Sequence, residues 1–380
     1  MKTEMTRDEK YMKMAAELAW KGAGRTNPNP MVGAVIVKEG RVIGSGYHER
    51  YGQLHAERNA LASCAEDPAG ATMYVTLEPC NHYGKTPPCT EAIIESGIAR
   101  VVVGTVDPNP KMAGRSIELL RSKGVETQTG VLEDECRELI KIFSKYITSG
   151  LPYVIMKWAM TLDGKIAAYT GASRWITGEK ARLHTHLTRN LCSAIMVGVE
   201  TVLRDDPLLT CRTENGRDPV RIICDSNLRT PLSAKAVQTA RIPEKKASQS
   251  AAPGLPRTII ATCNADPDRH RPYLEKGCMV LVTESDGGRT DLRDLMKKIA
   301  AMKIDSVLVE GGGELNWSAL DKKIVDAVQV YVAPKILGGR EAKTPVAGRG
   351  ASEPDMGFRL RNTRLSVIGG DYLIEGEVEY

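Results

Sequence analysis

The sequence predicts an α/β protein made of two domains. Its 380 residues exceed what a single hydrophobic core usually supports. Segments with strand patterns alternate with segments of helical periodicity along both halves of the chain. Between the halves, Ser149-Gly150-Leu151-Pro152 interrupts the pattern. We therefore expect a first domain over residues 1–149 and a second over residues 150–380.

The first domain is predicted to be a three-layer α/β/α unit. Thr6 and Glu9 form a capping-box pattern that begins a helix running to about Lys21. A turn at Glu39-Gly40 joins the first two strands, and a helix from residue 54 to 65 follows them. The predicted strands are 31–37, 41–47, 71–77, 100–105 and 125–128, and the later helices are 90–96, 116–122 and 131–148.

The second domain repeats the alternation. Its predicted strands are 153–161, 194–198, 219–224, 258–262, 278–283, 306–310, 327–333 and 365–378, with helices at 178–189 and 291–302. Residues 232–256, which include EKKASQSAAPGLP, are rich in Ala, Lys, Ser and Pro and are predicted to form an exposed loop.

Three consecutive glycines, Gly311 to Gly313, follow the predicted strand 306–310, and a helix is expected to begin there. Glycines let backbone N–H groups approach an anion at a helix N-terminus, so this turn could hold a phosphate. A plain tight turn explains the glycines equally well, because the dinucleotide spacing G-x-G-x-x-G is absent.

His55, Cys80 and Cys89, together with Glu57, form the most specific group of residues in the sequence. Catalytic zinc sites use three protein ligands and leave the fourth position to water. In zinc deaminases a carboxylate that is not a ligand moves the proton from this water to the leaving nitrogen, and Glu57 is the candidate. Cys80 follows a predicted strand, where the start of a helix or turn would favour its thiolate. The pattern predicts hydrolytic deamination.

The alternative is a closed structural zinc site or ordinary buried cysteines. A closed site would need a fourth ligand, and His82 lies so near Cys80 in sequence that we favour a substrate contact for it. The other cysteines lack ligand spacing and are interpreted as structural thiols, at positions 64, 136, 192, 211, 224, 263 and 278.

The spacing of the two cysteines narrows the class of deaminase. Nucleobase deaminases typically carry C-x-x-C, whereas here Asn-His-Tyr-Gly-Lys-Thr-Pro-Pro separates Cys80 from Cys89. The insertion is polar, basic and stiffened by two prolines. It is predicted to be a loop that faces the substrate.

Composition limits the partners and the compartment. The chain is 42% hydrophobic and 26% charged, its N-terminus MKTEMTRDEK has no signal-peptide pattern, and no apolar run is long enough to cross a bilayer. Nine cysteines, an odd number, favour reduced thiols and hence the cytoplasm. The net charge of +5 comes from dispersed basic residues, so we expect no nucleic-acid partner. The partners we expect are a small phosphorylated substrate and further copies of this chain.

The segment EPCNHYGKTPPC, with HAE upstream and GRTNPNPMVGAVIV near the start, resembles the bifunctional deaminase-reductase family of riboflavin biosynthesis. TLDGK (161–165), WITG (175–178), RDDPLLTCR (204–212) and EGGGELNWS (310–318) extend the resemblance over most of the chain. It implies a cytidine-deaminase-like first domain and a second domain that folds like dihydrofolate reductase, with Zn²⁺ and NADPH as cofactors.

The resemblance also implies the reaction. The first domain would deaminate 2,5-diamino-6-(5-phosphoribosylamino)pyrimidin-4-one to 5-amino-6-(5-phosphoribosylamino)uracil. The second domain, whose 230 or so residues a deaminase alone leaves unexplained, would reduce the ribosyl group to a ribityl chain with NADPH.

Matching motifs assign site residues. In the first domain the family's substrate pocket corresponds to Asn29, His48, His82, Lys85 and Thr86, with Lys85 as the natural phosphate partner. His48 fits a packed histidine at a strand end equally well. In the second domain the NADPH contacts correspond to Ala159, Trp175, Thr201, Asp205, Ser226, Gly312, Gly313, Glu314, Leu315, Asn316, Trp317 and Ser318, and the substrate contacts to Ser173, Arg189, Leu209, Arg212 and Glu310.

Chemistry supports part of this assignment. Arg189 and Arg212 can hold a substrate phosphate with forked donors, and Asp205 or Lys157 can supply the proton that accompanies hydride transfer. Plain structural roles also fit, since Trp175 can be a core residue, Arg212 a surface charge and Asp205 a turn cap.

The sequence departs from the family at a few positions. The family usually has an acidic residue at Ser193, a glycine at Glu200 and a more glycine-rich stretch than Ala113 to Ser116. A carboxylate at position 200 could crowd or repel an NADPH phosphate. It motivates a second hypothesis, a deaminase whose second domain does not reduce; a third, a nucleic-acid-editing module, lacks a basic aromatic stripe.

Overall fold

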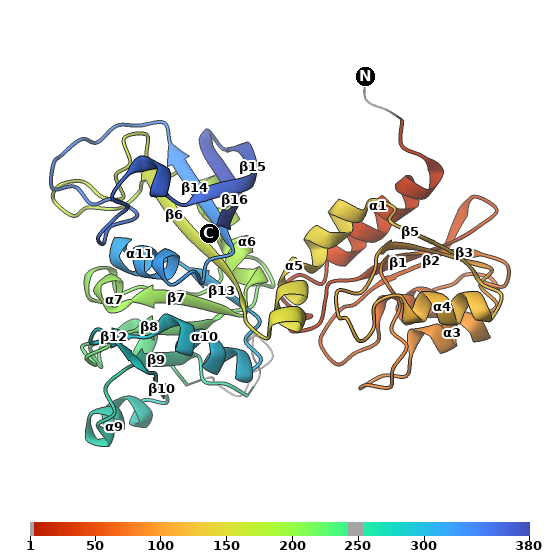
Figure 1. The fold of residues 1–380 in the computed structure, drawn as a ribbon, viewed down its shortest axis with the longest axis horizontal. Helices are drawn as coiled ribbons and strands as arrows, with labels where there is room; N and C mark the ends of the chain where they lie inside the picture. The colour runs from red at the N-terminus through yellow and green to blue at the C-terminus, as the bar shows by residue number, and fades with distance from the viewer. Residues whose placement is uncertain (1–3, 242–253) are drawn as a thin grey trace. The chain divides into compact units, whose positions relative to one another are not determined.

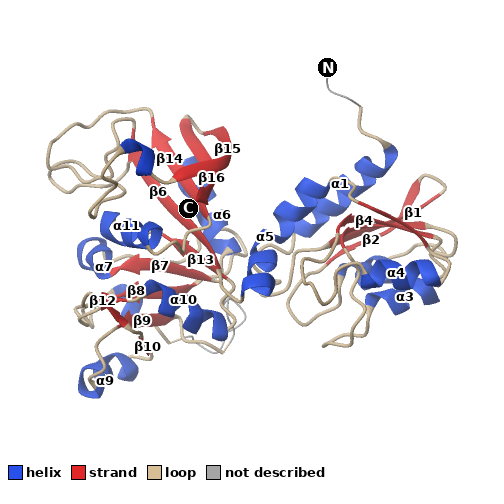
Figure 2. Cartoon of the chain, in the orientation of Figure 1, coloured by secondary structure: helices blue, strands red, loops and turns tan. Residues whose placement is uncertain are grey.

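The computed structural model describes residues 4–241 and 254–380 and divides into two compact units, Met1–Gly150 and Leu151–Tyr380. Figure 1 shows the path of the chain and Figure 2 its helices and strands. In the described ranges no helix is long and apolar enough to span a bilayer.

The first unit is a five-stranded sheet between two helical layers (Figures 1 and 2). The strand order is β2-β1-β3-β4-β5; β1 is antiparallel to both neighbours, and β3, β4 and β5 are parallel. Helices α1 and α5 cover one face, and α2, α3 and α4 cover the other. The elements are α1 (Arg7–Trp20), β1 (Gly33–Lys38), β2 (Arg41–Tyr47), α2 (Ala56–Ala62), β3 (Thr72–Leu77), α3 (Cys89–Glu95), β4 (Arg100–Thr105), α4 (Arg115–Ser122), β5 (Glu126–Thr129) and α5 (Glu133–Ser149).

Local chemistry explains how α1 sits on this sheet. The capping box predicted at Thr6 and Glu9 is present, with both hydrogen bonds made. Met12 and Ala15 are fully buried against Val35 and neighbouring strand residues. A Cβ on Gly33 would lie 1.9 Å from the carbonyl oxygen of Ala15, so only glycine lets the helix approach β1 this closely.

At the cysteine and histidine cluster, the start of α2 differs from the prediction, whereas α3 begins within one residue of its predicted start at position 90. Helix α2 begins at Ala56, so His55 is its N-cap residue and lies outside the helix. The chain after β3 stays irregular through Cys80, and the next helix, α3, begins at Cys89. The prolines of the insertion keep the chain extended just before this helix, because proline restricts the residue before it to extended backbone.

The second unit is built on a nine-stranded sheet with the order β10-β9-β8-β7-β13-β6-β14-β16-β15. The strands from β10 to β14 are parallel, and β14, β16 and β15 are antiparallel. Its strands are β6 (Tyr153–Thr161), β7 (Ala194–Gly198), β8 (Val220–Cys224), β9 (Thr258–Thr262), β10 (Met279–Val282), β13 (Ser306–Val309), β14 (Ala327–Ala333), β15 (Arg359–Ile368) and β16 (Asp371–Glu379), with a separate ribbon of β11 (Ser285–Asp286) and β12 (Arg289–Thr290).

Helices cover both faces of this sheet (Figure 1). One core lies between the sheet and α10 and α11, and another between the sheet and α7, α8 and α9. Helix α6 packs Ala181 against Tyr331 and Leu373. The helices are α6 (Glu179–Leu191), α7 (Val199–Asp205), α8 (Lys235–Gln238), α9 (Pro267–Glu275), α10 (Leu292–Ala301) and α11 (Gly313–Asp321), with a 3₁₀ turn at Pro354–Met356.

Two predictions in the second unit were wrong. Part of the predicted exposed loop 232–256 belongs to the core, because α8 lies there and Ala236, Val237 and Ala240 are fully buried. Residues 242–253, which hold most of EKKASQSAAPGLP, lie outside the described residues. The single strand predicted at 365–378 is a hairpin of β15 and β16, turned at Gly369 and Gly370, which have φ of 64° and 96°.

Candidate functional site

His55, Cys80 and Cys89 meet although they come from three separate segments. His55 caps α2, Cys80 lies in the loop after β3, and Cys89 begins α3. The Nδ1 atom of His55 is 3.4 Å from Sγ of Cys80 and 3.6 Å from Sγ of Cys89, and their ligand atoms all lie within 4.8 Å of one another. Zinc bonds of about 2.1 Å to nitrogen and 2.3 Å to sulfur, in a tetrahedron, would separate N and S by roughly 3.6 Å. The three side chains therefore fit a zinc ion.

Glu57 lies beside this cluster, in the first turn of α2, and is only 3% exposed. Burial raises the pKa of its carboxyl to about 7. The hydrogen bond with Cys89, together with His55, lowers the pKa of the Cys80 thiol to about 4 despite its burial. The site thus combines a ready thiolate with a carboxyl group that can hold or release a proton near neutral pH.

A cavity of about 330 Å³ is lined by His55, Glu57 and Cys80. Its lining includes every first-domain substrate residue predicted from the motifs, Asn29, His48, His82, Lys85 and Thr86. His48 is both packed and part of the lining. Its Nδ1 donates to the carbonyl oxygen of Leu54 (3.0 Å), burial lowers its pKa, and the neutral ring leaves Nε2 to accept from Nδ2 of Asn29 (3.3 Å). His48 therefore orients Asn29 toward the cavity.

The insertion between the cysteines is held at its far end by Arg58. Its Nε donates to the carbonyl oxygen of Pro87 (3.2 Å) and its Nη2 to that of Pro88 (2.8 Å). At the cavity rim, Nζ of Lys85 lies 4.1 Å from the ring centroid of Tyr51. The loop predicted to face the substrate does line the cavity, and Arg58 ties it to α2.

Glu78 holds in place the part of the cavity wall that the loop after β4 forms. Its carboxylate accepts the backbone N–H groups of Asp107 (3.1 Å), Gly114 (2.9 Å) and Ser116 (3.0 Å). This fixes the loop after β4, from which Asp107 and Asn109 reach the cavity. Sequence reasoning missed these two residues. Their signal was available, because polar residues that directly follow a strand parallel to β3 must lie at the same edge of the sheet.

The second unit has a cleft of about 1020 Å³ at the carboxyl ends of β7, β8 and β13. Ligands of parallel α/β sheets bind at such an edge. The predicted residues that line it are Ser173, Thr201, Asp205, Ser226, Glu310, Gly312, Gly313, Glu314, Leu315 and Ser318. The glycines lie where the chain passes from β13 into α11, so backbone N–H groups there are open to an anion. The cleft is large enough for a dinucleotide, and its glycine edge fits the phosphates of one.

The other predicted residues of this unit do not line the cleft. Leu209 is buried in the core, and Asn316 is fully buried with its Nδ2 donating to the carbonyl oxygen of Pro345 (2.8 Å). Trp317 lines a neighbouring cavity of about 390 Å³. Trp175 is 60% exposed, which contradicts a core role, and its ring faces Arg182 with 4.3 Å from Cζ to the centroid. Ala159, Arg212, Lys157 and Arg189 also lie outside the lining.

A charge cluster whose side chains are only 13–15% exposed adjoins the cleft, and its acidic member, Glu310, lines the cleft. Arg189 donates from Nε to Oε1 of Glu310 (2.7 Å) and from Nη2 to Oε2 (3.0 Å), and Nζ of Lys157 lies 3.8 Å from Oε2. Burial opposes ionisation of Glu310, but the two cations hold its pKa at about 2. Burial lowers the pKa of Lys157. The forked donors of Arg189, predicted to hold a phosphate, are here engaged by Glu310.

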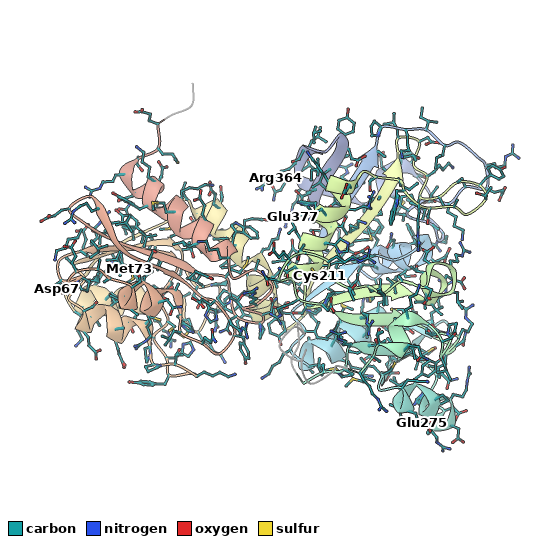
Figure 3. All side chains as sticks on the ribbon, turned by 180° about the vertical axis from the view of Figure 1, so that it is seen from behind. Asp67, Met73, Cys211, Glu275, Arg364 and Glu377 are labelled. Atoms are coloured by element: carbon teal, nitrogen blue, oxygen red, sulfur yellow. The ribbon has the colours of Figure 1, made fainter. Side chains whose placement is uncertain are left out.

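His186 belongs to the same region and was missed by sequence reasoning. It lies on α6 one turn before Arg189. Its backbone carbonyl oxygen accepts a hydrogen bond from the thiol of Cys211, a residue labelled in Figure 3. Burial, followed by the charges of Arg189 and Arg212, lowers the pKa of His186 to about 4. A histidine on a helix, here with His184 two residues before it, carries no sequence signal for such surroundings.

Known proteins match both units. The model of the cytidine and deoxycytidylate deaminase zinc-binding region matches residues 5–105, and that of the RibD C-terminal domain matches residues 152–374. The riboflavin biosynthesis protein RibD of Actinobacillus pleuropneumoniae is 50% identical over 368 residues, covering 97% of this chain and 94% of that protein. That of Aquifex aeolicus is 44% identical over 375 residues, covering 97% of each chain.

Solved structures agree over the full length. Acinetobacter baumannii RibD superposes with a TM-score of 0.84 at 33% identity, covering 99% of this chain and 100% of that one. A Thermotoga maritima diaminohydroxyphosphoribosylaminopyrimidine deaminase/5-amino-6-(5-phosphoribosylamino)uracil reductase superposes with a TM-score of 0.79 at 40% identity, covering 98% and 99%. The predicted fold classes of the two domains are confirmed, and nothing in these matches favours a second domain without reductase activity. The chain belongs to the RibD family of riboflavin biosynthesis proteins, in which a zinc-dependent deaminase domain precedes an NADPH-dependent reductase domain.

Proposed function

We propose that this chain deaminates 2,5-diamino-6-(5-phosphoribosylamino)pyrimidin-4-one and then reduces the ribosyl group of the resulting 5-amino-6-(5-phosphoribosylamino)uracil to a ribityl chain. The observation that carries the proposal is the meeting of His55, Cys80 and Cys89 next to Glu57, at a cavity that is lined by His55, Glu57, Cys80 and residues of the insertion between the cysteines. The relatives named above support the same pair of reactions. The domain boundary we propose lies at Ser149-Gly150, where α5 ends.

In the deaminase site we assign His55, Cys80 and Cys89 as zinc ligands. Zn²⁺ bound there would bring the pKa of a water molecule to about 7 and so make hydroxide available at neutral pH. Glu57 takes a proton from the attacking water and returns it to the leaving nitrogen; the ring carbon gains a C–O bond, its C–N bond breaks, and ammonia departs. A carboxyl with a pKa of about 7 suits both transfers.

Recognition of the pyrimidine falls to Asn29, His48, His82 and Thr86, which line the cavity. Lys85 is assigned to the substrate phosphate, since it is an exposed ammonium group at the rim. The Arg58 contacts to Pro87 and Pro88 keep this rim in place while the substrate enters and leaves.

NADPH bound in the reductase cleft would supply the hydride for the first ribosyl carbon. Asp205 and Lys157 are the two candidates for the accompanying proton. Asp205 is exposed at the end of α7 and lines the cleft with Glu310 and Thr201. Lys157 is buried next to Glu310, and its lowered pKa makes its ammonium a better acid. Undiminished NADPH oxidation by Asp205→Asn would assign the proton to Lys157.

A coupled assay tests the two activities separately. The zinc-loaded full chain receives the diamino substrate with and without NADPH, and ammonia release and NADPH oxidation are followed independently. We expect ammonia in both cases and oxidation only where NADPH and the deaminated product are both present. If ammonia is released but NADPH is not oxidised, even when the uracil intermediate is added directly, the deaminase activity stands and the reductase activity is refuted.

We further propose a homo-oligomer that works in the cytoplasm and binds no nucleic acid. Support for self-association comes from β15, an edge strand with nine of its ten residues exposed, including Leu365 and Val367; Arg364 on this strand and Glu377 on β16 are labelled in Figure 3. Support for the compartment comes from the nine cysteines, none of which forms a disulfide bond. Light scattering after gel filtration, with Leu365→Glu as the variant, tests the association; a monomeric parent protein would refute it.

A further inference from the structure

Glu200, which replaces the glycine usual in the family, forms an ion pair with Arg229 inside the reductase cleft. Oε1 of Glu200 lies 2.9 Å from Nη2 of Arg229, and both residues line the cleft. The carboxylate expected to repel an NADPH phosphate therefore has a cation directly against it. The pair places opposite charges at a single point of the cofactor cleft.

This point lies away from the reacting end of the cleft. Glu310, with Arg189 and Lys157 behind it, follows β13, whereas Arg229 follows β8. Strand β7 separates β13 from β8 in the sheet, so the two strand ends are about 10 Å apart at the usual spacing of neighbouring strands. A dinucleotide whose nicotinamide lies near Glu310 and whose phosphates lie over the glycines would place its adenosine end near β8.

The backbone that carries Arg229 is fixed before any ligand arrives. Asp225 is fully buried, and its Oδ2 accepts the backbone N–H of Thr230 (2.6 Å) and its hydroxyl (2.7 Å). The hydroxyl of Tyr273 bonds to the carbonyl oxygens of Leu228 (3.2 Å) and Thr230 (2.7 Å). Buried side chains thus hold the backbone of the turn 225–230 in place at residues 228 and 230, on either side of Arg229. Only the guanidinium end, half exposed, remains to adjust.

The same turn presents Ser226, which lines the cleft and whose Oγ accepts the backbone N–H of Thr290 (2.9 Å). A hydroxyl, a nearby guanidinium and a rigid turn are the groups with which proteins bind a phosphate on the adenosine ribose, whereas a carboxylate there favours the bare 2′-hydroxyl. Here the cleft presents both a guanidinium, from Arg229, and a carboxylate, from Glu200.

We propose that Arg229 binds the 2′-phosphate of NADPH and that Glu200 weakens the preference for NADPH over NADH by competing for Arg229. The proposal rests on the reductase function proposed above. The phosphate must displace or share the guanidinium donors that Glu200 now occupies, and it must approach a carboxylate. Loss of Arg229 should therefore weaken binding of the 2′-phosphate, and loss of the Glu200 charge should strengthen it.

The rival cation is Arg289, which also lines the cleft and pairs with Glu314 (3.3 Å). Its side chain is 66% exposed, and it lies in the short ribbon of β11 and β12 instead of on an anchored turn. Arg289→Gln is thus a matched control for Arg229→Gln, because each variant removes one guanidinium and leaves one carboxylate without its partner.

The test compares adenosine 2′,5′-bisphosphate with 5′-AMP by isothermal titration calorimetry on the zinc-loaded full chain, a readout independent of turnover. We expect the parent to prefer the bisphosphate and Arg229→Gln to reduce this preference about tenfold or more, as for the loss of a hydrogen bond between charged groups. Glu200→Gln should raise it by roughly two- to fivefold, the range of an exposed ion pair. Arg289→Gln should leave it within about twofold, since it is not the phosphate ligand.

Kinetics provide the second arm, as the ratio of kcat/KM for NADPH to that for NADH in the same variants. An unchanged ratio and unchanged bisphosphate preference in Arg229→Gln would overturn the proposal, as would a loss that appears only in Arg289→Gln. Equal weakening toward bisphosphate and 5′-AMP would also overturn it, because Arg229 would then bind a phosphate common to both. In each of these cases the parent still oxidises NADPH. A parent that neither binds nor oxidises NADPH would instead refute the reductase function itself.

Discussion

The two sites of this chain are assembled in different ways. In the deaminase unit the reactive groups come from short segments around the ends of β3 and α2, and they converge on a cavity of about 330 Å³. In the reductase unit the groups are spread along a cleft of about 1020 Å³ at the ends of three strands, with a mostly buried charge cluster adjoining it. A metal site demands particular ligand types at bonding distance, whereas a dinucleotide cleft relies largely on backbone groups and ion pairs. The difference separates chemistry that a few side chains carry from binding that many groups share.

The largest effect should come from the deaminase site, where one proton carrier stands alone. Glu57→Gln should lower the rate of ammonia release by about 10² to 10⁴, the usual contribution of general acid–base catalysis. The same preparation should oxidise NADPH normally when given 5-amino-6-(5-phosphoribosylamino)uracil, since Glu57 belongs to the first unit only. Undiminished ammonia release would remove Glu57 from the mechanism, and parallel loss of both activities would indicate a folding defect.

The reductase site should respond through stability as well as catalysis, because the charges of Glu310, Arg189 and Lys157 are mostly buried. Glu310→Gln leaves Arg189 and Lys157 without a counter-charge, and breaking such a pair typically costs about 3–5 kcal/mol. The control, Glu314→Gln, removes an exposed partner of Arg289 and should cost about 0–1 kcal/mol. The change in the free energy of unfolding is measured by urea unfolding followed by tryptophan fluorescence, since Trp158, Trp175 and Trp317 lie in the second unit. Equal midpoints for the two variants would show that the cluster does not stabilise the fold.

The smallest expected effect is a dependence of stability on pH that arises from His186 and Glu310, both in the second unit. Unfolded His186 binds a proton below about pH 6.5, but folded His186 does so only below about pH 4. The unfolded state therefore takes up more protons in this window, and stability falls as pH falls through it. Glu310 adds a loss with the same sign between pH 4.5 and about 2, where its unfolded carboxyl is protonated first.

His186→Gln isolates the first of these contributions. The variant should lose less stability than the parent between pH 6.5 and 4, measured as the shift of the thermal unfolding midpoint of the second unit. Identical pH profiles for parent and variant would mean that His186 titrates normally in the folded protein.

The comparison also explains what the sequence could predict. Residue type and spacing revealed the cysteines, His55, Glu57 and the insertion, because zinc chemistry restricts them. Arg58 and Glu78 carried no such signal, since their partners are backbone groups of Pro87, Pro88 and the loop 107–116.

In the reductase unit the limits were different. Arg189 and Glu310 were both assigned to the substrate by motif, but their mutual pairing depends on α6 and β13 being brought together by the fold. β15 was missed over its first half, because a strand exposed on almost every residue shows no alternation of apolar and polar side chains.

The way Glu78 holds the loop after β4 has a consequence for how this enzyme can vary. Its carboxylate contacts only backbone N–H groups at positions 107, 114 and 116. Position 114 still requires glycine, because its φ is 78°, and Ser116 is buried, whereas Ala113 and Arg115 between and beside them are exposed. Ala113 and Arg115 can therefore differ from the glycine-rich form usual in the family while the backbone anchor on Glu78 is kept. Because one acidic residue holds the loop through its backbone, the exposed positions 113 and 115 are places where surface properties could be redesigned without disturbing the chemistry next to them.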